Sequence, residues 1–222
     1  MNMDPMWNGR GKEEGRIMGL QVQKIKGPWE LEAAAAFRIG HLLWGTKEIP
    51  RTYGYLGYVP GKALYLELVC EEKDPLRRYQ NDQEPVYRDS AVEAFFQFGG
   101  RKEAGEQIYL NFEMNANGAL LAAYGKGRTD RVYFTEEECR KFACKARIEE
   151  ERWSVSLCIP FVILENVYGP LKFGPGTFFR CNFYKISETK EIEHYASYAL
   201  VDTDTPDFHR PEFFAEAQFC EV

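Results

Sequence analysis

The chain has 222 residues, of which 45% are hydrophobic and 15% aromatic. It can therefore build a sizeable core, and its length fits one large domain better than two small ones. The formal net charge of −6 and the isoelectric point near 5.3 argue against nucleic acid or an anionic membrane surface as the main partner. No apolar run approaches the roughly 18 residues of a transmembrane helix, so we expect no membrane-spanning segment.

Residues 1–17 are polar and glycine-rich, and they lack the basic start and apolar stretch of a secretory signal peptide. We expect a disordered tail there, followed by one domain over 18–222, with Met18 as an alternative start. None of the six cysteines forms a Cys-x-x-Cys pair, and three of them lie in apolar, strand-like runs, where a free cysteine behaves as a small hydrophobe. This usage predicts reduced thiols in a cytoplasmic protein.

Segments with the two-residue period of β-strands recur along the chain, and each has one strongly apolar face. In chain order they are ALYLELVC (63–70), AVEAFFQF (91–98), QIYLNFEMN (107–115), RWSVSLCIP (152–160) and TFFRCNFYKI (177–186). Many strands with turn-rich links between them are typical of an all-β protein. We predict an antiparallel β-sandwich with one or two short helices.

Helix signals are few. TEEECRKFACKA (135–146) opens with a capping box formed by Thr135 and Glu138. PFVILENVYG (160–169) begins with proline, which suits a first helical position, and it ends at glycine. WELEAAAAF (29–37) favours a helix on propensity alone.

The second face of three strands carries polar groups mixed with aromatic ones. These polar-face residues are Glu93, Asn111, Glu113, Asn115, Arg180, Asn182 and Tyr184. Carboxylate, amide and guanidinium groups can each offer two hydrogen-bonding atoms to neighbouring hydroxyls of a sugar. Tyr87, Tyr184 and Tyr198 are candidates to stack on its ring, and such a mixture is typical of a ligand site. The alternative is a sheet face that is simply exposed to water and has no function.

Glu93 differs from the other polar-face residues because Phe95 shares its face. A carboxylate beside aromatic rings is expected to be partly buried, and a buried charge needs a partner. Arg180 is our candidate partner.

Several segments, taken in order, resemble carbohydrate-binding module family 9 and its DOMON-like relatives. DSAVEAFFQF resembles the D-x-x-V-E-x-F strand, and YLNFEMNANG resembles the next strand with its N-x-x-G turn. WSVSLCIPF, FRCNFYKI and DFHRPEFFAEAQF are similar to three further motifs of the family, and together the segments run from about Leu64 to Phe219. The resemblance implies a jelly-roll-like β-sandwich that binds a mono- or oligosaccharide without catalysis, with calcium in a structural role and a place in carbohydrate catabolism.

The resemblance also implies roles for individual residues. Glu93 matches the glutamate of the V-E pair, and Asn182 matches the asparagine of the R-x-N motif. Tyr87 stands six residues before the glutamate, where the family has the first of two tryptophans that clamp the sugar. The second tryptophan has no clear counterpart, and the nearest aromatic residues are Tyr184, Tyr195 and Tyr198. Tyrosine in place of tryptophan implies weaker, altered or absent binding.

Two other functions remain open on the residues. Glu93 and Glu113 could form the carboxyl pair of a glycoside hydrolase, which needs two such groups about 5–10 Å apart. Some DOMON-like relatives bind haem through methionine and histidine or lysine, which makes Met114 and Lys185 candidate ligands. Met114 alternates with core residues and is equally explained as a core side chain.

Metal ligation by histidine is poorly supported, because His41, His194 and His209 show no ligand spacing. VDTDTPD offers Asp202, Asp204 and Asp207 as hard oxygen ligands for calcium. The alternative is an acidic surface turn, since the loop lacks the glycine and the terminal glutamate of an EF-hand.

Overall fold

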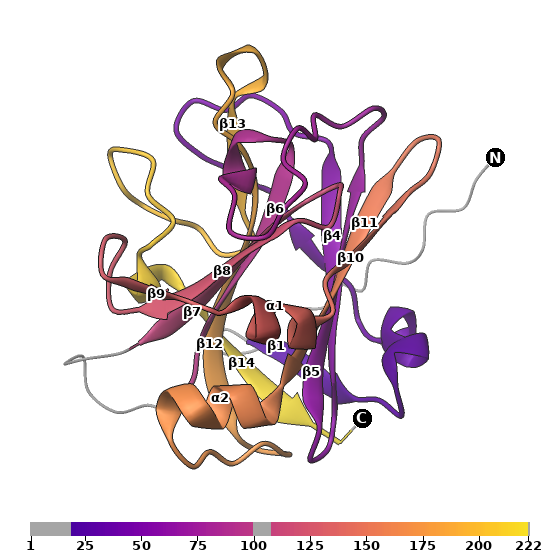
Figure 1. Cartoon of the computed structure of the whole chain (residues 1–222), viewed down its shortest axis with the longest axis vertical. Helices are drawn as coiled ribbons and strands as arrows, with labels where there is room; N and C mark the ends of the chain where they lie inside the picture. Colours follow the sequence, from indigo (N-terminus) through magenta and orange to yellow (C-terminus); the bar gives the residue numbers. More distant parts are fainter. Residues whose placement is uncertain (1–18, 100–107, 222) are drawn as a thin grey trace, which may run out of the picture.

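The computed structural model describes residues 19–99 and 108–221 (Figure 1). The tail expected over 1–17 lies outside the described residues. The strands are β1 (Leu20–Lys24), β2 (Phe37–Ile39), β3 (His41–Leu42), β4 (Arg51–Val59), β5 (Ala63–Glu71), β6 (Ala91–Gln97), β7 (Tyr109–Asn115), β8 (Leu120–Gly125), β9 (Arg131–Tyr133), β10 (Lys145–Ile148), β11 (Trp153–Pro160), β12 (Phe178–Ser187), β13 (His194–Ser197) and β14 (Ala215–Cys220). The helices are α1 (Glu136–Phe142) and α2 (Phe161–Tyr168), and the 3₁₀ turns are η1 (Pro28–Ala33), η2 (Val86–Arg88), η3 (Lys190–Ile192) and η4 (Pro211–Phe213).

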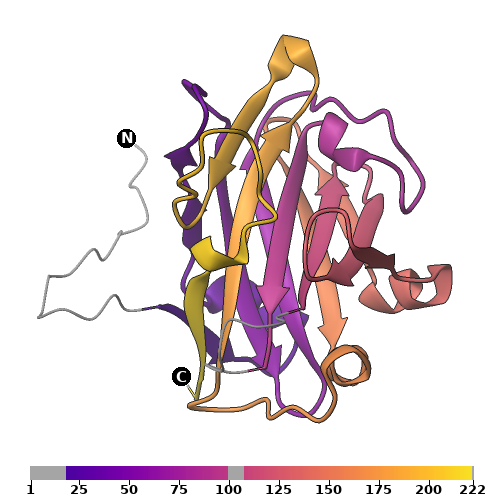
Figure 2. The same cartoon turned by 90° about the vertical axis from the view of Figure 1, so that its left-hand side faces the viewer.

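The strands of the described residues form one 14-stranded sheet with the central order β10-β11-β5-β4-β1-β14-β12-β6-β7-β8-β9. The sheet curls so that its two halves face each other, with β4, β5, β10 and β11 in one half and β6, β7, β8 and β12 in the other (Figures 1 and 2). The all-β prediction is confirmed, but the sheet is mixed. Strand β1 runs parallel to both of its neighbours, β4 and β14, and joins the two halves.

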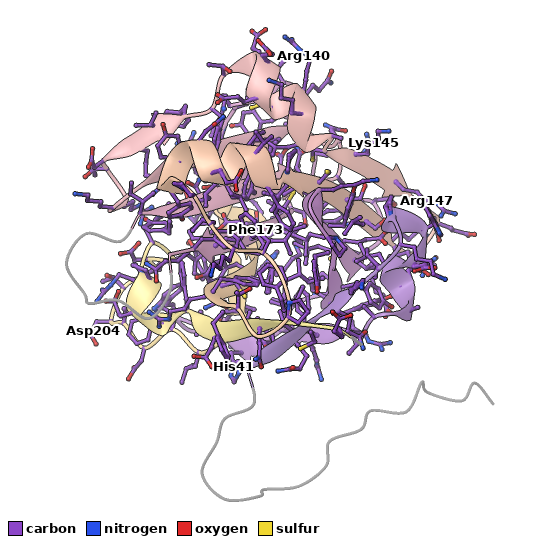
Figure 3. All side chains as sticks on the ribbon, turned by 90° about the horizontal axis from the view of Figure 1, so that it is seen from below. His41, Arg140, Lys145, Arg147, Phe173 and Asp204 are labelled. Carbon is purple, nitrogen blue, oxygen red and sulfur yellow. The ribbon has the colours of Figure 1, made fainter. Side chains whose placement is uncertain are left out.

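The main core lies between the two halves, and it consists of the apolar faces that the two-residue period predicts. On β6, Val92, Ala94 and Phe96 are fully buried in this core. On β12, Phe179 and Phe183 occupy the same layer. Seen from below, side chains fill the space between the sheet halves (Figure 3).

Both predicted helices form. Helix α1 begins after Thr135, whose side chain and that of Glu138 make the reciprocal bonds of a capping box. Helix α2 follows β11 directly, with Pro160 as its N-cap. The segment 29–37 does not form the helix that its propensity favours. It forms the 3₁₀ turn η1 and then enters β2, because Leu31 and Phe37 are both buried against the sheet. None of the described helices is long and apolar enough to cross a membrane.

The second face of β6, β7 and β12 is also covered. Every residue of β6 and β7 is buried. Strand β13 extends the sheet beside β12, and the segment that follows it (residues 198–214) packs over this face (Figure 2). They form a second cluster of buried residues: Leu43, Ala91, Phe95, Tyr109, Tyr184, Ile186, Tyr195, Val201, Phe208 and Phe214. The alternative of a polar face that is simply exposed to water therefore does not hold for these strands. A pocket remains open beside the covering segment.

Candidate functional site

A pocket of about 170 Å³ opens over β6, β7 and β8, beside the covering segment. Its walls come from at least six parts of the chain that are far apart in sequence. The lining residues are Trp44, Tyr87, Glu93, Asn111, Glu113, Leu121, Ala123, Arg128, Arg131, Tyr133, Ile186, Glu188, Tyr195, Pro206, Asp207, Phe208 and His209. Four residues that the sequence proposed for a sugar site, Tyr87, Glu93, Asn111 and Glu113, are among them.

Two carboxyl groups form the floor of this pocket. Glu93 on β6 lies directly opposite Glu113 on β7. Directly opposed residues have Cβ atoms about 4.5–5.5 Å apart, so the two carboxyl groups lie side by side in the floor. Only 3% of Glu93 and 5% of Glu113 is exposed. Asn111 Nδ2 donates a hydrogen bond of 3.0 Å to Glu113 Oε1.

The two carboxyl groups resist ionisation. Burial raises the pKa of Glu113 to about 7, although the hydrogen bond from Asn111 and the nearby Arg131 oppose this shift. Burial, together with the charges of Glu113 and Glu188, raises the pKa of Glu93 well above its usual value. A pair in which one member keeps its proton and the other ionises near neutral pH supplies both a hydrogen-bond donor and an acceptor.

Two arginines form the polar side of the pocket. The Arg131 guanidinium lies over the Tyr109 ring, 4.3 Å from its centroid, and donates to Asn111 Oδ1 and to the carbonyls of Tyr109 and Ala123. Arg128 is half exposed at the rim, where it pairs with Asp207 at 3.6 Å and with Glu188 at 4.0 Å. Arg131 is therefore a fixed part of the wall, whereas Arg128 is held at the rim by two ion pairs and by one bond to the Pro206 carbonyl.

Aromatic rings form the remaining walls. Trp44 follows β3 in a tight turn in which both Trp44 and Gly45 have positive φ angles, 47° and 82°. The turn is tied to β13 because Tyr195 N donates to Thr46 Oγ1 at 2.9 Å. The Trp44 indole then donates to the Thr203 carbonyl at 2.8 Å, and its ring packs against Tyr195 and Phe208.

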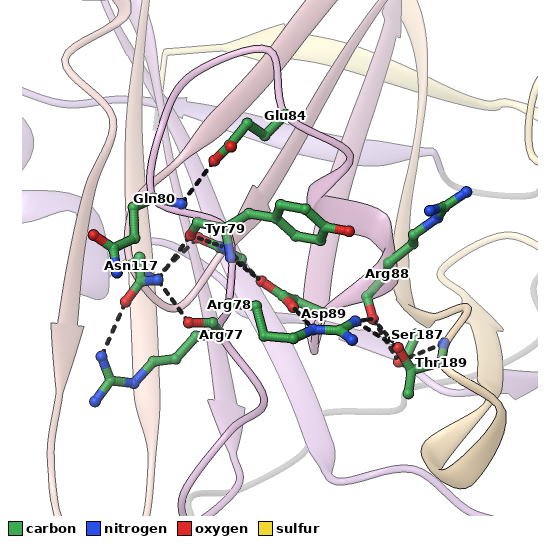
Figure 4. A network of polar contacts seen from close by, with 11 residues as sticks. Arg77, Arg78, Tyr79, Gln80, Glu84, Arg88, Asp89, Asn117, Ser187 and Thr189 are labelled. Carbon is green, nitrogen blue, oxygen red and sulfur yellow. Dashed lines mark hydrogen bonds and ion pairs between the residues drawn. The ribbon is translucent and has the colours of Figure 1, made fainter.

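A network of polar contacts holds the loop that carries Tyr87 (Figure 4). The buried Asp89 carboxylate accepts bonds from Tyr79 N at 3.0 Å and from Asn115 Nδ2 at 2.9 Å, and Arg78 pairs with it at 3.2 Å. Arg78 also donates to the Arg88 carbonyl and to Thr189 Oγ1, while Glu188 N donates to the Tyr87 carbonyl. The contacts fix turn η2 between β7 and the end of β12, which places Tyr87 at the pocket.

The other sequence-predicted binding residues lie elsewhere. Arg180 donates to the carbonyls of Glu212 and Phe214, and so it is not the partner of Glu93. It stands opposite Gln97, four residues along β6 from Glu93. Asn182, with no exposed surface, exchanges hydrogen bonds with the backbone of Ala199.

The two further tyrosines are also outside the pocket lining. Tyr184 is completely buried, stacks on Phe208 with ring centroids 4.0 Å apart, and donates to its carbonyl. Tyr198 packs on the main core beside Phe37 and Phe183. Of the three aromatic residues considered for the second clamp position, only Tyr195 lines the pocket.

The candidate calcium ligands are not gathered at one point. Asp202 and Asp204 are exposed, and Asp204 lies at the edge of the molecule in Figure 3. Asp207 instead lines the pocket, pairs with Arg128 and accepts a bond from His209 N. Among the residues that the structure describes, no group of three or more His, Cys, Asp or Glu residues could hold a metal ion.

The candidate haem ligands are both committed to packing or polar contacts. Met114 is fully buried in the main core. Lys185 Nζ donates to Ser90 Oγ and lies 3.7 Å from the Glu72 carboxylate, which also accepts a bond from the Trp153 indole. This buried polar group ties the two halves of the sheet together and leaves the lysine without a free lone pair for iron.

Sequence reasoning missed several lining residues, above all Trp44, Arg128, Arg131, Glu188 and His209. They come from loops or from the short strand β9, where no periodicity marks a face. A tryptophan directly before the turn residue Gly45 was the one available signal for Trp44. His209 Nδ1 shares a hydrogen bond of 2.8 Å with the Tyr109 hydroxyl, which positions its ring at the pocket.

Comparisons with known proteins give the family and the fold. The family model described as carbohydrate-binding family 9 matches residues 31–219. A candidate carbohydrate-binding protein from Bacteroides uniformis superposes with a TM-score of 0.73 at 21% identity, over 90% of this chain and 98% of its own. No match was found among curated proteins.

Two structures of a family 9 module from Caldicellulosiruptor kristjanssonii show the same fold. The complex with glucose superposes with a TM-score of 0.62 at 13% identity, over 91% of this chain and 96% of that one. The complex with cellotriose gives 0.60 at 12% identity, over 91% and 94%. The family model covers most of the chain, and so this protein belongs to carbohydrate-binding family 9.

Proposed function

We propose that the pocket binds one sugar unit, either a monosaccharide or the end of an oligosaccharide, and does not cleave it. The observation that carries the proposal is the combination of aromatic walls with a polar floor in a pocket of about 170 Å³. A cavity of about 150 Å³ accommodates one benzene ring, so the available volume suits a single six-membered ring.

The chemistry of each wall matches one part of a pyranose. Its C–H face is apolar and packs on rings such as Tyr87 and Trp44, which line the pocket and are only partly buried. Its hydroxyls need donors and acceptors, which Glu93 and Glu113 offer at the floor. Arg131 is pre-ordered by its bonds to backbone carbonyls, and this reduces the entropy lost on binding.

The position of the two carboxyl groups favours binding over hydrolysis. Glycosidases place their two carboxyl groups on either side of the scissile bond. Here both groups come from adjacent strands and the same sheet face, so they approach a ligand from one side. This arrangement is suited to holding hydroxyls. The two other carboxyl groups of the lining, Glu188 and Asp207, are paired with Arg128 at the rim and are therefore not free to act as an acid or base partner.

Calorimetric titration with glucose, cellobiose and cellotriose tests the proposal, because the similarly folded modules were solved with glucose and cellotriose. We expect saturable binding that is lost in Tyr87→Ala and in Trp44→Ala. Tyr53→Ala is the matched control, since Tyr53 is a partly buried tyrosine on β4 that does not line this pocket. If the well-folded wild type binds none of a broad sugar panel, the proposal is wrong.

A further inference from the structure

The pocket carries more acidic than basic groups. Glu93, Glu113, Glu188 and Asp207 line it, against two arginines. The third basic candidate, His209, does not contribute charge, because burial and the two arginines lower its pKa to about 3. Even with Glu93 protonated, as its raised pKa favours, the other three carboxyl groups of the lining outnumber the two arginines.

The two arginines do not form ion pairs with the floor carboxyl groups. Arg128 is paired with Glu188 and Asp207 at the rim. Arg131 donates to Asn111 Oδ1 and to the three backbone carbonyls of Tyr109, Ala123 and Gly127. Among the described residues, no lysine or arginine nitrogen lies within 4.0 Å of the floor carboxyl groups.

Glu93 is the floor residue whose carboxyl group is available to a ligand. It is 97% buried, as its 3% exposure shows, and it faces the pocket. Within the described part of the chain, its carboxyl group has neither a hydrogen-bond partner nor an ion-pair partner, whereas Glu113 has Asn111. A buried carboxyl group without a partner is costly, so a ligand that supplies donors and positive charge would remove that cost.

We propose that the floor formed by Glu93 and Glu113 binds the ammonium group of an amino sugar, while the aromatic walls hold its ring. This inference rests on the proposed sugar-binding function and names the class of sugar. An ammonium group has three donors and a positive charge, which match two adjacent carboxyl groups. A uronic acid would bring a third carboxylate to the same wall, and an N-acetyl group would remove the charge.

A metal ion is a less suitable occupant of the floor than an ammonium group. Calcium takes six to eight oxygen ligands, and the described residues offer no group of three acidic or metal-binding side chains at one point. An ammonium group needs only two or three acceptors, which the pair supplies.

The test is a titration of the full chain at pH 7.5 with glucosamine, glucose, N-acetylglucosamine and glucuronate, and with cyclohexylamine as an amine without hydroxyls. We expect glucosamine to bind at least about tenfold more tightly than glucose, a difference of about 1.4 kcal/mol. Cyclohexylamine should bind more weakly than glucosamine, because it lacks the ring hydroxyls. A titration with a glucosamine dimer distinguishes a free monosaccharide from a chain end.

Three variants distinguish the contribution of the floor carboxyl groups from the effect of the overall charge of the protein. Glu93→Gln should reduce the ratio of glucosamine to glucose affinity to about one, since an amide keeps the shape of a protonated carboxyl group but cannot ionise to pair with the ammonium group. Glu113→Gln is the second floor variant, used if Glu93→Gln does not fold. Glu151→Gln, an exposed carboxylate paired with Lys73, should keep the wild-type ratio.

The outcomes distinguish this inference from the proposed function. Binding of glucose or N-acetylglucosamine as tight as that of glucosamine would overturn the amino-sugar inference and leave sugar binding intact. Equal binding of cyclohexylamine and glucosamine would overturn it as well, because the ring would then not be recognised. If the well-folded wild-type protein binds none of these sugars, the proposed function itself is overturned.

Discussion

The floor pair should make the stability of this protein depend on pH in a way that a single substitution removes. Burial raises the pKa of Glu113 from 4.5 to about 7. Between these two values the folded state binds more protons than the unfolded state, so the free energy of unfolding falls as the pH rises. The contribution of protonated Glu113 is complete below pH 4.5 and is lost as the pH passes through about 7.

The size of this effect follows from the shift. One pKa unit corresponds to about 1.4 kcal/mol, so Glu113 should change the free energy of unfolding by about 3 kcal/mol across the interval. The group is 5% exposed, so solvent does little to reduce the effect. Glu113→Gln keeps the acceptor for Asn111 Nδ2 but cannot ionise. The variant should therefore become progressively more stable than the wild type as the pH rises.

Urea unfolding of both proteins at half-unit steps from pH 4.5 to 8.5 measures this directly. The difference between the two free energies removes the contributions of groups that are unaffected by the substitution. We expect the difference to grow in favour of the variant up to about pH 8 and then to level off. A difference that stays constant across the range would refute the assignment of a raised pKa to Glu113.

Three further predictions concern the residues that support the pocket and the core. Asp89→Ala leaves the donors Tyr79 N and Asn115 Nδ2 without their acceptor, so urea unfolding should show a free energy of unfolding that is lower by about 2–6 kcal/mol. Sugar affinity should fall as well. Lys185→Met leaves the Glu72 carboxylate without its cation and should lower the free energy of unfolding by about 3–5 kcal/mol. Adding Glu72→Gln should restore part of this stability, and a double variant without any recovery would contradict the pairing. The Cys181 thiol is fully buried, and burial raises its pKa, so a thiol reagent should leave it unmodified until the protein unfolds.

The strand faces were predictable because alternation is a local property. Val92, Ala94 and Phe96 had to share one face of a strand, and the structure buries all three in the main core. The capping box at Thr135 is equally local, since its two partners are three residues apart. Residues 29–37 show the limit of this reasoning, because burial of Phe37 in β2 outweighs the helix propensity of the alanines.

The composition of the pocket was only partly predictable. Glu93, Asn111 and Glu113 share a face on adjacent strands, so placing them together required only that β6 and β7 pair as a hairpin. Arg180 and Tyr184 share that face on β12, yet neither lines the pocket, because the segment after β13 packs over β12 and bonds to both of them. Nothing in the alternation of a strand indicates what will cover it.

The amino-acid sequence by itself determined the all-β class, the core faces of the strands and the family, because these depend on local periodicity and on ordered motifs along the chain. Only the tertiary structure decided which polar side chains are covered by other segments and which line the pocket. It also brought Trp44 and Arg131 to Glu93, across 49 and 38 residues of chain. Such contacts depend on sheet curvature, strand register and loop packing, all of which arise only when distant segments meet.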